Sequence, residues 1–210
     1  MVNLSDKRKR VLDLFKAGGF AFVHVPKTAG FSITCELLDG NITEHATATE
    51  LRVNIGETEW AKLFTFAFVR DPATRFVSAF WYLKAGGMNE RDSNWARVAL
   101  SKTDSAEDFV GVLTEDNTGL AEWVHFRPQC HFLCDAGTET LLVEFIGRFE
   151  NLQEDYLYIL RKIGLAARYL PRRNQSDHHE ELVGTWGATA RRQLVKLYHR
   201  DYELLGYPVP

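Results

Sequence analysis

Two stretches near the start of the chain share one pattern of hydrophobic and polar positions. Residues 20–25 and 63–69 are short runs rich in aromatic and β-branched side chains, as is typical of buried β-strands. A tight turn follows each run. Residues 31–38 then have helical character, and a second helix should begin at Pro72, with Asp71 as its cap. The apolar positions of that second helix lie at helical spacing: Phe76, Ala79, Phe80 and Leu83.

The same alternation continues further along the chain. Residues 141–146 predict a third strand that leads into a helix near residue 150, and residues 86–120 predict helical pieces joined by loops. From about residue 188 we expect one closing helix, which stops at Gly206. Its apolar stripe consists of Leu194, Leu197, Tyr198, Tyr202 and Leu205. Strands alternating with helices predict an α/β fold in three layers, with a mainly parallel sheet flanked by helices.

Composition limits the number of domains and the kinds of partner. The 210 residues, 45% of them hydrophobic, suffice for one core, so we expect a single domain over residues 1–210. The net charge of −3 does not indicate nucleic acid as a partner. No apolar run reaches the roughly 18 residues of a membrane span. Asp13 and Lys16 interrupt the apolar stretch after the basic residues 7–10, so we expect a solvated helix there and no cleaved signal.

The cysteines bear on the compartment and on metal binding. Their number is three, which argues against a disulfide framework and favours a reducing, cytoplasmic location for a soluble protein. Cys130 and Cys134 lie near His125 and His131, but this spacing fits no standard zinc signature. We therefore expect no metal.

The loop after the first predicted strand has the character of an anion site. Backbone N–H groups at a helix start favour negative charge, Gly30 permits close approach or an unusual backbone angle, and Lys27 adds a positive charge. Thr28 and Ser32 supply hydroxyl groups. The loop lacks the Lys-Ser/Thr pair with which nucleotide triphosphatases hold magnesium, which weakens a kinase hypothesis.

A second anion contact is predicted after the next strand. Arg70 stands at the carboxyl end of that strand, where open α/β sheets usually meet their ligands. Ser78 follows two helical turns later. Together they are suited to hold a phosphate through charge-assisted and hydroxyl hydrogen bonds.

Residues 22–32, FVHVPKTAGFS, and residues 68–78, FVRDPATRFVS, together resemble the sulfotransferases that use 3′-phosphoadenosine 5′-phosphosulfate (PAPS), in the branch of the heparan sulfate 2-O-sulfotransferases and small bacterial enzymes. The resemblance continues through residues 147–152 and covers most of the chain. It implies a P-loop-like fold, transfer of a sulfuryl group to an acceptor hydroxyl, 3′,5′-adenosine bisphosphate as product and no metal. The phosphosulfate loop maps onto Pro26, Lys27, Thr28, Ala29, Gly30, Phe31 and Ser32.

The resemblance also assigns roles outside the loop. Arg70 and Ser78 match the 3′-phosphate site. A further stretch of the nucleotide site maps onto Arg173, Asn174 and Ser176. The catalytic pair is then Lys27, which neutralises the leaving phosphate oxygen, and His45 as base. The family often shows a His-x-His pattern that this sequence lacks, so Glu44 and Glu50 stay open as alternative bases, and His24 is expected to be structural.

Acceptor recognition is expected from residues 123–129, which combine aromatic side chains with His125, Arg127 and Gln129. That composition suits a sugar or an anionic small molecule, and equally a packed loop. The sequence leaves the acceptor and the oligomeric state open. Two other functions compete: a P-loop kinase or phosphotransferase that needs magnesium, and a nucleotide-binding protein that has lost transfer activity.

Overall fold

The computed structural model describes residues 6–41, 44–135, 138, 140–171 and 182–210. These residues form two compact units. The first holds the described residues up to Arg70 and those from Gln129 to residue 171, and the second holds Asp71 to Pro128 together with residues 182–210. The organisation of residues 1–210 as one domain stays a prediction.

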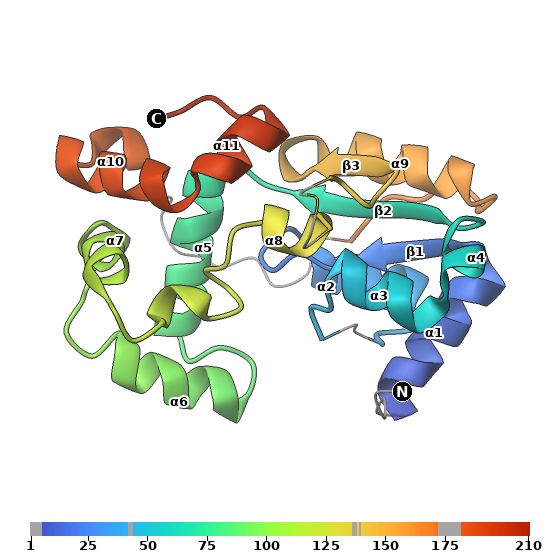
Figure 1. Ribbon diagram of the computed structural model, residues 1–210, viewed down its shortest axis with the longest axis horizontal. Coiled ribbons are helices and arrows are strands. Elements are labelled where there is room, and N and C mark those ends of the chain that lie inside the picture. Colours follow the sequence, from blue (N-terminus) through green and yellow to red (C-terminus); the bar gives the residue numbers. More distant parts are fainter. Residues whose placement is uncertain (1–5, 42–43, 136–137, 139, 172–181) are drawn as a thin grey trace. The chain divides into compact units, whose positions relative to one another are not determined.

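The first unit is built on a parallel sheet of three strands in the order β1-β2-β3, namely β1 (Phe20–Val23), β2 (Phe64–Val69) and β3 (Phe145–Arg148). Central strand β2 pairs with β1 from Phe64 to Ala67 and with β3 from Phe66 to Val69. Figure 1 shows β2 between its two neighbours. All three strands therefore end at the same edge of the sheet, which is the edge where ligands are usually bound.

Helices cover this sheet. Helix α1 packs against β1, and α9 packs against β3. The helices of this unit, within its described residues, are α1 (Asp6–Gly18), α2 (Gly30–Leu37), α3 (Ala48–Ile55), α4 (Glu57–Trp60), α8 (Cys130–Leu133) and α9 (Leu152–Lys162), with a 3₁₀ turn η2 (Phe149–Asn151). The predicted α/β class, with a parallel sheet flanked by helices, is confirmed.

Aromatic side chains fill the sheet's core. Phe22 and Phe66 on neighbouring strands are fully buried, and their ring centroids lie 5.2 Å apart. Phe68 is also fully buried and lies opposite Gly147 in the register of β2 with β3. A Cβ atom at Gly147 would lie 2.6 Å from the Phe68 ring. Glycine is therefore needed at residue 147 to let the third strand pair closely with the second.

The second unit is helical among its described residues. It contains α5 (Pro72–Lys84), α6 (Glu90–Ala99), α7 (Ala106–Glu115) and the 3₁₀ turns η1 (Leu120–Glu122) and η3 (Val183–Thr185), followed by α10 (Ala188–Leu197) and α11 (His199–Leu205). The Asp71 side chain accepts a hydrogen bond from the Thr74 N–H at 2.8 Å, and Pro72 occupies the first turn of α5. Both confirm the predicted start of this helix. The helical pieces predicted within residues 86–120 are confirmed as α6 and α7.

Two predicted boundaries are wrong. The third strand was expected at residues 141–146, but β3 begins at Phe145, because Leu141 instead forms an antiparallel bridge with Cys134. The single closing helix is two helices, since Tyr198 leaves the helical region at φ −114° and ψ 22° between them. The predicted stop is confirmed by Gly206, which has the left-handed φ of 65°.

Within the part of the chain that the structure describes, no helix combines the length and apolar character needed to cross a membrane. The cytoplasmic location stays a prediction.

Candidate functional site

The loop after β1 is tightly closed by its own side chains. Thr28 is fully buried, and its hydroxyl donates a hydrogen bond of 2.9 Å to the Val25 carbonyl oxygen. Helix α2 then begins at Gly30, with Ser32 buried in its first turn. No described side chain caps the start of this helix, because the cap position is Ala29. The first N–H groups of α2 are thus left to other hydrogen-bond acceptors, as an anion site requires.

Non-glycine residues at this edge adopt the left-handed backbone conformation. Lys27 has φ 70° and Ala29 φ 67°, while Glu44 and His45 have φ 54° and 57°. This region is unfavourable for residues with a Cβ atom and is enriched at ligand sites. The sequence predicted close approach or an unusual backbone angle at Gly30. Gly30 is not among the left-handed residues, whereas Lys27 and Ala29 are.

Gly30 is needed for close approach. A Cβ atom at Gly30 would lie 1.9 Å from the imidazole of His24. His24 is buried, as expected for a structural histidine. The centroid of its ring also lies 4.3 Å from the centroid of the His45 ring. His24 therefore fills the space between the start of α2 and the candidate base.

His45 is held by a backbone contact. Its Nδ1 atom lies 3.0 Å from the His24 carbonyl oxygen. Since a carbonyl oxygen only accepts, the contact assigns the hydrogen to Nδ1. The other ring nitrogen, Nε2, then carries the lone pair. In this tautomer Nε2 is the ring nitrogen that can accept a proton, as a general base must.

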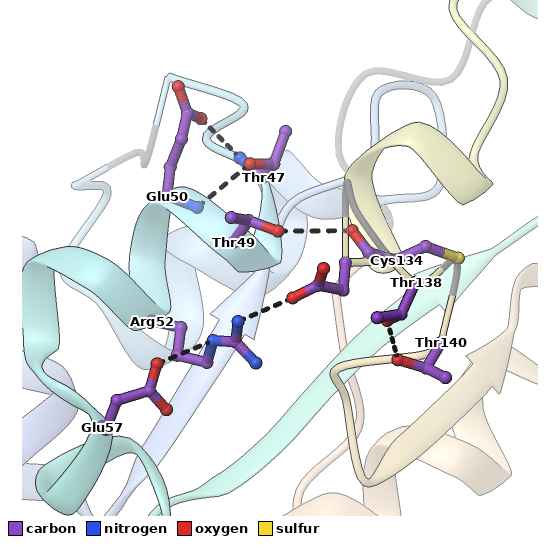
Figure 2. A network of polar contacts seen from close by, with 9 residues as sticks. Thr47, Thr49, Glu50, Arg52, Glu57, Cys134, Thr138 and Thr140 are labelled. Carbon is purple, nitrogen blue, oxygen red and sulfur yellow. Dashed lines mark hydrogen bonds and ion pairs between the residues drawn. The ribbon is translucent and has the colours of Figure 1, made fainter.

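Both alternative carboxylate bases are engaged in structural contacts. Glu50 completes a capping box with Thr47 at the start of α3: its Oε2 accepts from the Thr47 N–H at 2.8 Å, and its own N–H donates to Thr47 Oγ1 at 3.1 Å (Figure 2). Glu44 is paired with Arg8, at 3.1 Å between Oε2 and Nε. These contacts favour His45 over the two glutamates.

Helix α3, which follows His45, is anchored to the segment after α8. Thr49 Oγ1 lies 3.4 Å from the Cys134 carbonyl oxygen, and Arg52 contacts both Glu57 at 3.2 Å and Asp135 at 2.7 Å. Figure 2 shows Thr49 directed at Cys134, with Arg52 further along α3 and Glu57 at the start of α4. The segment that carries His45 is thus fixed at its carboxyl side by a network of polar contacts.

Arg70 follows β2 and belongs to the same sheet edge. Its backbone N–H donates to Gln129 Oε1 at 3.0 Å, and its carbonyl oxygen accepts from Gln129 Nε2 at 2.8 Å. The guanidinium carbon lies 4.3 Å from the centre of the Phe149 ring. The loop at residues 26–32 and Arg70 therefore stand at the ends of adjacent strands in one unit.

The other predicted residues fall elsewhere. Ser78 lies half-buried on α5 in the second unit, so its pairing with Arg70 stays a prediction. His125 and Arg127 also belong to the second unit, whereas Gln129 is fully buried in the first. The predicted nucleotide contacts Arg173, Asn174 and Ser176 lie outside the described residues.

The segment that carries His125 and Arg127 is fixed by two buried side chains. Arg75, fully buried, donates to the carbonyl oxygens of His125 at 3.2 Å and Arg127 at 2.6 Å. The Tyr198 hydroxyl donates to the Phe126 carbonyl oxygen at 2.8 Å, and burial raises the pKa of this phenol above its ordinary value. Three successive carbonyl groups are thus satisfied from the core of the second unit.

The His125 side chain belongs to a buried polar cluster. Its Nε2 lies 3.3 Å from Asp92 Oδ1, while Asp92 Oδ2 accepts from the Tyr82 hydroxyl at 2.7 Å and from Asn89 Nδ2 at 3.0 Å. Burial alone would raise the pKa of the Asp92 carboxyl, but its contacts with His125, Tyr82 and Asn89 hold that pKa below its ordinary value. His125 thus has a structural partner in addition to any role with substrate.

Comparison with known proteins identifies the class of protein to which this fold and candidate site belong. A model described as the sulfotransferase family matches residues 14–208. The chain belongs to the sulfotransferase family.

Among individual proteins, the chain is similar to carbohydrate sulfotransferase 12 of Mus musculus, with 29% identity over 71% of the chain and 41% of that protein. Carbohydrate sulfotransferase 11 of Rattus norvegicus is 27% identical over 69% of the chain and 47% of its own length. The chain thus spans less than half the length of these relatives. No solved structure matches it.

Three features of the site were not found from sequence. They are the bidentate contact of Gln129 with Arg70, the Phe149 ring beside the Arg70 guanidinium, and the contact of His24 with His45. Only His24 carried a local signal, because it directly precedes the loop. The other two join residues 59 and 79 positions apart, and no motif spacing links them.

Proposed function

We propose that this chain transfers the sulfuryl group of PAPS to a hydroxyl group, and that the acceptor is a carbohydrate. The observation that carries the proposal is the family match over residues 14–208. The carbohydrate acceptor is supported by the names of the relatives. We further propose that the fold is the P-loop-like, three-layer fold that the family implies.

The donor's phosphosulfate would bind at residues 26–32. The support is the absence of a described side-chain cap at the start of α2, together with the positive charge of Lys27 and the buried hydroxyl of Ser32. The Thr28 hydroxyl keeps the loop closed. The left-handed conformations of Lys27 and Ala29 fix the direction of the backbone on either side of Thr28.

The proposed reaction is an in-line displacement at sulfur. The acceptor hydroxyl oxygen forms a bond to sulfur, the bond from sulfur to the 5′-phosphate oxygen breaks, and the electron pair leaves on that phosphate. The hydroxyl proton goes to Nε2 of His45. Lys27 offsets the negative charge that develops on the departing oxygen.

Arg70 and Ser78 would bind the 3′-phosphate of the nucleotide. The position of Arg70 at the carboxyl end of β2, next to the strand that carries the loop, supports its part in this site. Arg173, Asn174 and Ser176 would complete the nucleotide site, and His125 and Arg127 would contribute to acceptor recognition. Gln129, predicted to take part in acceptor recognition, is buried with its carboxamide on the Arg70 backbone. No metal enters the proposed reaction.

The competing functions predict other requirements. A kinase or phosphotransferase would need magnesium, and an inactive nucleotide-binding protein would bind the bisphosphate without turnover. Lys27 in the loop and the tautomer assigned to His45 favour retained chemistry.

Incubation with radiolabelled PAPS and a panel of carbohydrate, lipid and tyrosine acceptors tests the proposal. We expect label to move to a carbohydrate, with no stimulation by magnesium and no loss in EDTA. Arg70→Ala should lower the affinity for 3′,5′-adenosine bisphosphate by about one to two decades, the effect of losing a charge-assisted contact, and Ser78→Ala should lower it less. Transfer to no acceptor, with the bisphosphate still bound, would favour the inactive binding protein.

A further inference from the structure

Arg70 is held by its backbone as well as by its side chain. Strand β2 ends at Val69, one residue before Arg70. Beyond that end, the Gln129 carboxamide accepts from the Arg70 N–H and donates to the Arg70 carbonyl oxygen, at 3.0 and 2.8 Å. A single side chain thus makes the two hydrogen bonds that a residue of a neighbouring strand would make. Gln129 is fully buried, so these bonds do not compete with bulk water.

The Arg70 guanidinium lies against an aromatic face. Phe149 follows β3 directly, and its ring centre lies 4.3 Å from the guanidinium carbon of Arg70. The backbone of β3 is fixed at this point, because the Arg148 N–H donates to Asp155 Oδ2 at 2.6 Å. Contact with an aromatic face uses the flat surface of a guanidinium and leaves the fork geometry of its in-plane N–H donors unchanged.

We infer that Gln129 and Phe149 are positioning residues that fix Arg70, and that they thereby set the preference of the nucleotide site for a 3′-phosphate. The inference rests on the proposed function, in which Arg70 binds that phosphate. Gln129 fixes where the residue leaves the sheet, and Phe149 fixes the plane of the guanidinium. A bidentate contact to phosphate depends on both, because the fork geometry of arginine is rigid.

The test compares the affinities of 3′,5′-adenosine bisphosphate and 5′-AMP by calorimetry, in wild type and four variants. Phe149→Leu keeps apolar volume but loses the aromatic face, and Phe149→Tyr keeps the face. Gln129→Leu removes both hydrogen bonds, and Gln129→Glu keeps the shape but removes the donor to the Arg70 carbonyl oxygen. The readout is the ratio of the two affinities, which a loss of overall stability does not change selectively.

We expect Gln129→Leu and Gln129→Glu to reduce the preference for bisphosphate about tenfold, and Phe149→Leu to reduce it about three- to fivefold, which matches the size of a cation–π contact. Affinity for AMP should stay near wild type in each case. Phe149→Tyr should keep the wild-type ratio. In an Arg70→Ala background, Phe149→Leu should cause no further change.

Other results would contradict the proposed function, the inference or both. A wild-type protein without preference for bisphosphate would overturn the proposed function and this inference together. A wild-type preference that Arg70→Ala removes, but that the Gln129 and Phe149 variants retain, would overturn only the inference. An equal loss for both ligands would show that these residues are merely structural. Where the Gln129 variants do not fold, the comparison of Phe149→Leu with Phe149→Tyr decides.

Discussion

The Nδ1 atom of His45 lies 3.0 Å from the backbone carbonyl oxygen of His24. Because the carbonyl can only accept, the contact assigns the hydrogen to Nδ1 and leaves the lone pair on Nε2. The ring centroids of His24 and His45 lie 4.3 Å apart. One histidine therefore orients the other through its backbone and limits the movement of its ring.

Replacement of His45 should separate chemistry from binding. His45→Ala should lower turnover by roughly two to four decades, the range for loss of a positioned base, with bisphosphate affinity near wild type. His45→Asn keeps an amide donor for the His24 carbonyl oxygen and should be equally slow, but more stable to heat than the alanine variant. Single-turnover rates and thermal unfolding check both statements. Near-normal turnover by His45→Ala would eliminate it as base and direct the same assay to Glu44 and Glu50.

The pH profile gives a second check on His45. A base works only in its unprotonated form, so wild-type single-turnover rates should rise with pH as the imidazole loses its proton. His45→Ala should lose this dependence. The same rise in the variant would assign the titration to another group.

Lys27 should contribute to both donor binding and the transition state. Lys27→Ala should lower turnover and also weaken PAPS binding, since the positive charge meets the donor before and during transfer. Lys62→Ala is the matched control, because Lys62 is a surface residue whose ammonium is paired with Glu59 at 2.6 Å. Equilibrium binding and single-turnover rates measure the two effects. Unchanged PAPS affinity in Lys27→Ala would contradict the ground-state contact.

Gly30 should be essential although its own backbone is not left-handed. In Gly30→Ala the new Cβ would lie 1.9 Å from the His24 ring, so that ring must move and His45 with it. We expect turnover to fall at least tenfold and donor affinity to fall as well. Gly184→Ala is the control, since a Cβ there meets nothing within 4 Å and its φ is not left-handed. Equal activities of the two variants would show that the His24 ring can shift without consequence.

The buried carboxyl of Asp92 should make stability depend on acid pH. Burial raises its pKa, but hydrogen bonds from His125, Tyr82 and Asn89 leave the net pKa below its ordinary value. A carboxyl with a lowered folded-state pKa stabilises the fold above the unfolded-state pKa, about 3.9, and loses that contribution as pH falls through the folded-state value. Asp92→Asn should therefore cost about 1–3 kcal/mol at neutral pH, with the difference from wild type shrinking below about pH 4.

Denaturant unfolding at several pH values measures this difference. Asp104→Asn serves as the control, because the Asp104 side chain is fully exposed beside Lys84. A difference for Asp92→Asn that stays constant down to pH 2 would mean that the carboxyl does not titrate with folding.

The elements that could be predicted are those specified by neighbouring residues. Strands β1 and β2 are runs rich in aromatic and β-branched side chains, and α5 begins where Asp71 and Pro72 provide a local cap and first turn. The start of β3 was missed because Phe145 is selected by its register with Phe66 on β2, about 80 residues earlier. The break between α10 and α11 falls at Tyr198, whose hydroxyl is bound to the distant Phe126 carbonyl oxygen. Hydrophobic periodicity along the chain does not indicate contacts between residues so far apart in sequence.

In the candidate site, too, the sequence indicates only the residues that stand in local motifs. Lys27, Gly30 and Arg70 stand in two short motifs, and both motifs follow strands that end at one sheet edge. Sequence reasoning therefore identified them as site residues. Gln129 was interpreted as a residue facing substrate, because residues 123–129 combine aromatic and polar side chains. In the structure its carboxamide is buried on the Arg70 backbone, and only the fold brings these two residues together.

The left-handed backbone of Lys27 and Ala29 has a consequence for engineering. An L-residue in this conformation costs roughly 1 kcal/mol or more relative to glycine, so the edge of the sheet carries strain that a simple substitution relieves. Selection for heat resistance would be expected to recover Ala29→Gly among its early gains. The same change would loosen the start of α2, so resistance to heat and speed of transfer would be in conflict at this one position.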